Sequence, residues 1–383
     1  MTFSSEGTST VWPGVSKPFS STPVYSRAFP PRTRNSAMRL PMLIALLASA
    51  APAHAEFFCV SDSAGFAAAL ESARTNEDLD DTIRLRLGTY PSPPTGFAPV
   101  APFAAGDSIT IEGGWWDSNE GPCTEEFSTS TLDGAGSRPV LRLEHAAGGG
   151  DITLRKLVIS NGKANGLEGN RDQGGGLSIE AQAGYVGTVT IELCRFQGNS
   201  AIAPGGAGHL GNHGGTLVVR NNFFLGNNAP SGAALQVYGD GGAIHVANNT
   251  FGLNVPTING AAGTAFGVAG TNAVTLTNNV FWLNAFSAQH DLLGPAQVLI
   301  QNDIQRIGQA PAPGSSGNLS VDPRFEDGDF TAPSADSPLV NAGNNTPLGG
   351  LTEFDLNGRA RVNEGTVDIG AYETEFVFRD GFE

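Results

Sequence analysis

The chain has 383 residues, of which 51 are glycine and 15% are charged, and its formal net charge is −16 at pH 7. An acidic surface of this kind repels nucleic acid and anionic membranes, so we expect no nucleic-acid partner. A hydrophobic content of 40% excludes a disordered chain and, with so much glycine, favours a turn-rich β protein.

The start of the chain is typical of a leader. Residues 1–37 are rich in serine, proline and threonine and lack periodicity, so we interpret them as a disordered upstream extension of the reading frame. Residues 38–55 have a basic start, an apolar run and the ending Ala53-His54-Ala55, which predicts a cleaved signal peptide. We expect export to the extracellular space or outer cell surface, with the periplasm as the alternative, and no transmembrane span in the mature chain.

The next segment reads as an N-terminal cap. Residues 64–74 place Phe66, Leu70 and Ala73 on one helical face, and a lone amphipathic helix ahead of a solenoid covers its open end. Cys59 and Cys123 are the candidate disulfide in an oxidising compartment. We interpret Cys194 as a free, buried, small hydrophobe.

Four copies of one phrase organise the rest of the chain. They start at Val189, Leu217, Ile244 and Val274, which lie 28, 27 and 30 residues apart, and a fainter copy starts at Ile152. Positions one and three are aliphatic and position eight is phenylalanine, so these side chains should point inward and stack from copy to copy. Repeats of this length, made of short strands, indicate a solenoid.

Paired asparagines in the phrase predict a turn and a ladder. Asparagine tolerates left-handed backbone angles, and identical amides stacked on successive coils can bridge them. A second strand, preceded by glycines, lies before each copy. We therefore predict an all-β fold, a right-handed parallel β-helix with an N-terminal capping helix and an irregular C-terminal cap. The predicted ladder consists of Asn221, Asn222, Asn248, Asn249, Asn278 and Asn279.

The succession ITIEGGWW, STLDGAG, ITLRKLVISNG and the repeated phrases resembles exported bacterial proteins of the pectin-lyase-like β-helix superfamily. Downstream, VDPRF, DSPLVNAG, DLNGR and TVDIGAYE resemble a choice-of-anchor Q region. The resemblance implies fold and export, and hardly an activity. We expect a β-helix with its cap over 56–310, a Q-like region over 311–374 and a tail over 375–383.

Aligning the copies shows which side chains leave the coil. Position four gives an outward column of alternating charge, about 5 Å apart on adjacent coils. One interpretation is a polar groove that holds an oligosaccharide; the other, which we favour, is a ladder of charge pairs on a solvated face. The ligand-binding candidates are Arg155, Glu192, Arg220, His213, Gln236, Tyr238 and Asp240, and the candidate catalytic bases are Arg220, His209 and His245.

The residues that a hydrolase or a zinc site would need are missing from the sequence. The few outward acids of the central coils are scattered, and a polygalacturonase-type hydrolase would need a carboxylate pair that is missing. No histidine spacing suits zinc, so we expect no metal site and no cofactor; calcium would enter only with a lyase activity.

Two functions follow from this pattern. The first is a cell-surface-associated β-helix protein, expected to be a monomer, that binds or displays glycans without chemistry of its own. The alternative is a polysaccharide lyase acting on uronate polymers, which would need Arg220, His209, His213 and His245 to converge in one cleft. A purely structural spacer is a third hypothesis, favoured if the loop 161–175 covers the groove.

Overall fold

The computed structural model describes residues 57–76, 79–126, 128–166, 172–258, 263–271, 273–284, 289–295, 297–326, 330–363 and 365–374. The predicted leader, signal peptide and C-terminal tail lie outside these residues. Within these ranges, no helix combines the length and apolarity needed to cross a membrane.

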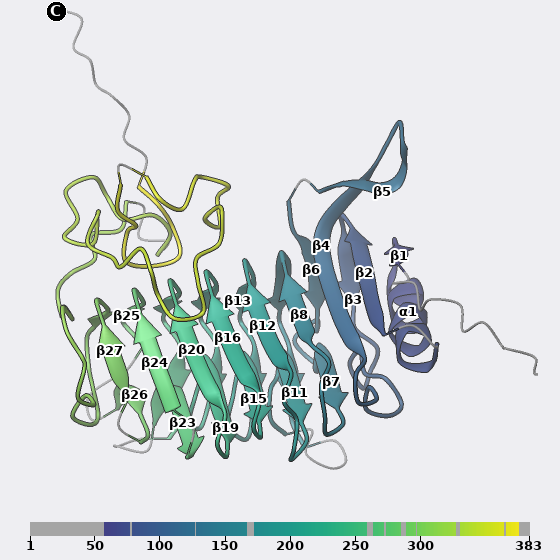
Figure 1. Cartoon of the computed structure of the whole chain (residues 1–383), viewed down its shortest axis with the longest axis horizontal. Coiled ribbons are helices and arrows are strands. Elements are labelled where there is room, and N and C mark those ends of the chain that lie inside the picture. Colours follow the sequence, from purple (N-terminus) through teal and green to yellow (C-terminus); the bar gives the residue numbers. More distant parts are fainter. Residues whose placement is uncertain are drawn as a thin grey trace, which may run out of the picture. The chain divides into compact units, whose positions relative to one another are not determined.

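Four sheets share the coils of a right-handed parallel β-helix (Figure 1). The ten-stranded sheet contains β1 (Phe57–Val60), β2 (Asp80–Arg86), β4 (Ser108–Ser118), β5 (Gly121–Glu126), β8 (Ile152–Arg155), β12 (Thr188–Glu192), β16 (Thr216–Arg220), β20 (Ala243–Ala247), β24 (Ala273–Thr277) and β27 (Val298–Ile300). The six-stranded sheet contains β7 (Leu141–His145), β11 (Leu177–Ala181), β15 (Gly208–Asn212), β19 (Leu235–Gly239), β23 (Thr264–Gly270) and β26 (His290–Leu293).

Two further sheets complete each coil. The eight-stranded sheet contains β3 (Thr89–Pro91), β6 (Ser130–Asp133), β9 (Leu157–Ser160), β13 (Arg195–Gln197), β17 (Phe223–Leu225), β21 (Thr250–Gly252), β25 (Val280–Trp282) and β28 (Asp303–Ile304). The four-stranded sheet contains β10 (Lys163–Ala164), β14 (Ser200–Ala201), β18 (Asn228–Ala229) and β22 (Val255–Pro256). The repeats of the sequence are therefore single coils, each contributing one strand to each of the three larger sheets. The four-stranded sheet takes one strand from each of the coils that start at Ile152, Val189, Leu217 and Ile244.

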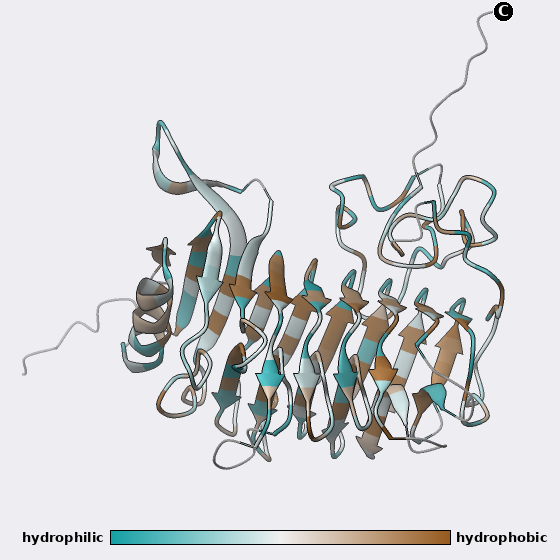
Figure 2. Ribbon diagram, turned by 180° about the vertical axis from the view of Figure 1, so that it is seen from behind, coloured by the Kyte–Doolittle hydropathy of each residue, from teal (hydrophilic) through white to brown (hydrophobic). Residues whose placement is uncertain are grey.

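The core lies inside the coils, where the alternating residues point. Figure 2 shows hydrophobic residues concentrated along the strands. The phenylalanines at position eight form the predicted stack: the rings of Phe196, Phe224, Phe251 and Phe281 follow one another at 4.8, 4.7 and 4.3 Å between centroids, within 6° of parallel. All four side chains are at most 1% exposed.

The two asparagines of each pair have different structural roles. Asn221, Asn248 and Asn278 take left-handed backbone angles, with φ of 54°, 54° and 58°, and turn the chain between two sheets. The second member of each pair forms the buried ladder, in which each side-chain oxygen accepts from the backbone and side-chain amides of the preceding coil. The ladder continues beyond the predicted residues to Asn302 and Asn318. A second ladder, not predicted, joins Asn199, Asn227, Asn254 and Asn284.

The N-terminal end carries the expected helix, α1 (Ser63–Thr75), whose buried residues include Phe66, Leu70 and Ala73. Asp62 caps it by accepting from the Gly65 amide at 2.7 Å. Strands β4 and β5 form an antiparallel hairpin, and the Cys59–Cys123 disulfide joins β5 to β1. Cys194 is free and buried, as its place in a coil suggested.

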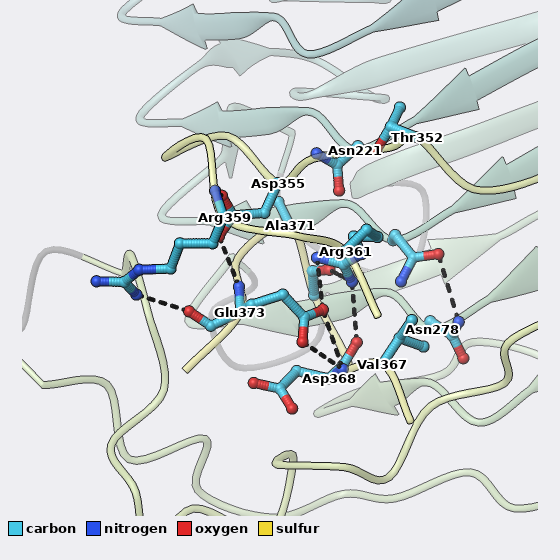
Figure 3. A network of polar contacts seen from close by, with 12 residues as sticks. Asn221, Asn278, Thr352, Asp355, Arg359, Arg361, Val367, Asp368, Ala371 and Glu373 are labelled. Atoms are coloured by element: carbon cyan, nitrogen blue, oxygen red, sulfur yellow. Dashed lines mark hydrogen bonds and ion pairs between the residues drawn. The ribbon is translucent and has the colours of Figure 1, made fainter. Parts of the chain in front are cut away.

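The C-terminal region, residues 311–374, first continues the coils, where Ser316 and Leu319 pair in parallel with Ile300 and Asp303; its later described residues form no strand and dock along the flank of the coils (Figures 1 and 3). The turn asparagines hold it: the Asn221 side-chain amide donates to the Phe354 carbonyl, and Asn278 exchanges two hydrogen bonds with Asn344. Inside the region, the fully buried Arg361 pairs with Glu373 at 3.1 Å. Its placement extends the expected cap from the end of the solenoid onto several coils.

Candidate functional site

The structure divides the predicted site residues between two faces. The ten-stranded sheet carries Arg155, Glu192, Arg220 and His245, whereas His209, Gln236 and Tyr238 belong to the six-stranded sheet and His213 follows β15 directly. Asp240 follows β19, is exposed, and accepts a 3.5 Å hydrogen bond from the Thr271 hydroxyl. The four residues that a lyase was expected to bring together are therefore on different sheets.

The outward column of the ten-stranded sheet is a charge ladder. Glu192 lies between Arg155, at 3.5 Å, and Arg220, at 2.7 Å. The column continues toward the N-terminus through Glu112, which faces Arg155 at 3.5 Å and Arg84 at 3.9 Å. Each charge thus has a neighbour of opposite sign one coil away, which is the stabilising arrangement for stacked strands.

The C-terminal region covers the end of this column. The Arg220 guanidinium donates to the Gly349 carbonyl at 2.5 Å, and a Cβ on Gly349 would lie 3.0 Å from that of His245. Burial lowers the pKa of His245 below its ordinary value. Both residues are therefore engaged in docking the C-terminal region, which makes them poor candidates for a catalytic base.

The six-stranded face holds a compact polar cluster around Tyr238. Glycine at position 211 leaves the sheet bare, so the Tyr238 side chain lies across it and its hydroxyl donates to a Glu180 carboxylate oxygen two coils away. A Cβ on Gly211 would lie 2.6 Å from that hydroxyl and 2.9 Å from the Glu180 carboxylate. The missing side chain is thus what allows the end of the Tyr238 side chain to lie over position 211 and reach Glu180.

Two histidines complete this cluster. The His209 ring lies 4.6 Å from the Tyr238 ring, and the His213 ring meets it edge-on at 5.4 Å. His213 also faces Glu180, with 3.5 Å between Nε2 and the carboxylate. We call Glu180, His209, His213 and Tyr238 the polar cluster.

The electrostatics of the polar cluster follow from burial. Desolvation lowers the pKa of His209 to about 4, so this ring is neutral at physiological pH. Desolvation also raises the pKa of Glu180, against the opposing effect of nearby His213. The cluster therefore presents a neutral imidazole, a phenol and a carboxylate, which are groups that exchange hydrogen bonds with hydroxyl-rich ligands.

Two hollows lie on either side of His209 along the same outward row. The first is small, about 20 Å³, and is lined by Arg142 and Ser178 together with Thr95, Gly96, Pro139, Leu141, Gln173 and Gly174. The second, about 220 Å³, is lined by Gln236, Gly267 and Leu293 together with Ser231, Thr264, Val268 and Gly294. The register joins these residues into one row of the sheet, Arg142, Ser178, His209, Gln236, Gly267 and Leu293.

We call this row, with a hollow toward each of its ends, the groove. Its six strands span roughly 24 Å at the usual spacing of strands, enough for several sugar units. The described part of the loop 161–175 borders the first hollow through Gln173 and Gly174, and residues 167–171 lie outside the described part of the chain. The described residues of this loop therefore form one side of the groove and do not lie over it.

The described residues contain one group of three potential metal ligands, and two of its members are bonded to each other. This group has three ligand atoms within 4.8 Å of one another, Cys59, Asp117 and Cys123, but both sulfurs belong to the disulfide. Arg361 and Glu373 form a buried network with Asp355 and Asp368 inside the C-terminal region (Figure 3). That network is closed on itself and is structural.

Sequence reasoning missed two features of the groove. Glu180 was not among the predicted site residues, because its partner Tyr238 lies two coils away. Gly211 carried a signal that could have been used: it is the one small residue between Glu180 and Tyr238 in an outward column of polar side chains. Comparisons with family models, with curated proteins and with solved structures found no match to this chain.

Proposed function

We propose that this chain is an exported, cell-surface-associated protein that binds glycans in the groove of its six-stranded sheet. We also propose that it belongs with the pectin-lyase-like β-helix proteins and that residues 311–374 form a choice-of-anchor Q type region, on the motifs given above. Export is supported by the Cys59–Cys123 disulfide, because such bonds persist in oxidising compartments.

The observation that carries the proposal is the position of the Tyr238 ring. An aromatic ring beside polar side chains is suited to sugars, whose apolar faces stack on such rings while their hydroxyls exchange hydrogen bonds. His209 and Gln236 face each other on adjacent strands, two residues before Gly211 and Tyr238, and are each only 8% exposed, so they are held in place before a ligand arrives. Preorganisation of this kind lowers the entropic cost of binding.

Binding is better supported than catalysis by the placement of the candidate bases. A lyase needs a base, an acid and a group that neutralises the uronate carboxylate around one carbon atom. Arg220 and His245 lie on the ten-stranded sheet beneath the C-terminal region, away from His209 and His213. The uronate lyase remains the rival hypothesis; among the described residues, its grouped acid and base residues are the polar cluster on one sheet and Arg155, Glu192 and Arg220, which line one hollow, on the other.

Affinity electrophoresis in gels that contain a panel of polysaccharides tests the proposal. We expect retardation by at least one polysaccharide, and its loss in Tyr238→Ala. Gly211→Ala should have the same effect, because its new Cβ displaces the Tyr238 ring. Gly149→Ala is the matched control, since a Cβ there meets nothing within 4 Å.

Two results would contradict glycan binding at this face. One is the absence of retardation by every polysaccharide in the panel. The other is retardation that Tyr238→Ala and Gly211→Ala leave unchanged while both variants remain folded by circular dichroism.

A further inference from the structure

We infer that the groove accepts neutral glycans and excludes polyuronates, through the charges that border it. This inference rests on the proposed glycan binding and adds the class of ligand. It reverses the expectation of a uronate ligand that accompanied the lyase hypothesis.

The charges on the face are predominantly negative. Among the outward residues of β7, β11, β15, β19 and β23, Arg142 is the one permanent cation, whereas Glu144 and Glu180 are both acids. The two carboxylates stand on adjacent coils in register, which is an unfavourable placement for like charges. His209 is buried and neutral, so it does not offset them.

The single cation is already engaged. The Arg142 guanidinium pairs with Glu144 at 2.6 Å, and both side chains are about one-third exposed, at 30% and 31%. A uronate that recruited Arg142 would have to displace Glu144 and leave that carboxylate beside the incoming charge. Glu180 has the Tyr238 hydroxyl and His213 as its direct partners, while Arg142 and Glu144 act on it from farther away with opposite signs.

The consequence for specificity is direct. A neutral sugar can use the hydroxyl, amide and imidazole groups of the groove without electrostatic cost. A polyuronate carries one negative charge per unit and would lie beside the row that holds Glu144 and Glu180, which we expect to weaken binding by roughly tenfold. Because the carboxylates are partly exposed, this discrimination should shrink as salt shortens the screening length.

The test compares two polymers on the purified protein, a neutral β-linked glucan or mannan and a polygalacturonate or alginate, in low and high salt. The measured quantity is the ratio of the two affinities. We expect the neutral polymer to bind at least about tenfold more tightly in low salt, and the ratio to fall in about 1 M salt, where the screening length is about 3 Å.

Glu144→Gln provides the decisive variant, because it removes one carboxylate and leaves Arg142 without its ion pair. It should shift the affinity ratio toward the uronate by about tenfold. Glu326→Gln changes the net charge equally at an exposed site in the C-terminal region and should leave the ratio unchanged.

The outcomes separate the two proposals. Tighter binding of the uronate in low salt, or no change of the ratio in Glu144→Gln, would overturn the exclusion of polyuronates while glycan binding stands. Binding of neither polymer, nor of any in the wider panel, would remove glycan binding itself and the inference with it.

Discussion

Replacing Asn249 by alanine should break the main asparagine ladder between Asn222 and Asn279. This side chain is fully buried and makes five hydrogen bonds. Its amide nitrogen donates to the carbonyls of Val219 and Ala247 and to the Asn279 side chain, at 2.9 to 3.0 Å. Its oxygen accepts from the backbone and side-chain amides of Asn222, at 2.9 and 3.0 Å.

The magnitude follows from these partners. Each buried hydrogen bond contributes about 1 kcal/mol net, and partners left unsatisfied cost more. Allowing for relaxation among five coupled bonds, the loss in the free energy of unfolding should be about 4 kcal/mol. The adjacent Asn248→Gly is the control, because Asn248 has a φ of 54°, which glycine adopts readily; its side-chain nitrogen has no hydrogen-bond partner, and its oxygen accepts one long hydrogen bond, at 3.3 Å, from Asn278.

Chemical denaturation followed by circular dichroism measures both variants. We expect a large drop in the midpoint for Asn249→Ala and a change within about 1 kcal/mol for Asn248→Gly. Equal losses in the two variants, or no loss in either, would refute the assignment of the second asparagine to the ladder and the first to the turn.

Three further predictions address the last coils, the disulfide and the C-terminal region. Burial raises the pKa of Asp303 from 3.8 to about 6, so the free energy of unfolding falls as pH rises between these values. In urea unfolding, Asp303→Asn should be more stable than wild type by about 2–3 kcal/mol at pH 8, and the two should be equally stable near pH 4. Equal pH profiles would contradict this. Cys123→Ser opens a cross-link of 64 residues and should cost about 4 kcal/mol, measured the same way; a loss below about 1 kcal/mol would count against it. Arg220→Ala loses the hydrogen bond to the Gly349 carbonyl and should speed limited proteolysis at residues 349–358 while the coils stay folded; unchanged cleavage would exclude a docking role.

Much of the coil could be predicted because its contacts repeat at a fixed sequence spacing. The phenylalanine stack and the buried strands follow from positions one, three and eight, whose neighbours are the same positions one coil away. The charge ladder was visible for the same reason from Arg155 to Arg220. Its continuation through Arg84 and Glu112 was not, because the first coils lack the repeated phrase.

The docking of the C-terminal region and the polar cluster depend on contacts that cannot be predicted from residue types. The C-terminal region docks largely through backbone carbonyls, such as those of Gly349 and Phe354, which any sequence supplies. The polar cluster depends on a side chain that crosses a whole coil, from Tyr238 over Gly211 to Glu180. Alignment of adjacent coils predicts neighbours but not a contact that skips one.

Hydrogen exchange with and without a retained neutral glycan tests most directly where the ligand lies. The account predicts slower exchange at β15 and β19, on either side of the Tyr238 ring, and no change at β16 and β20 of the ten-stranded sheet. Protection of β16 and β20 instead, with β15 and β19 unchanged, would contradict binding at the six-stranded face.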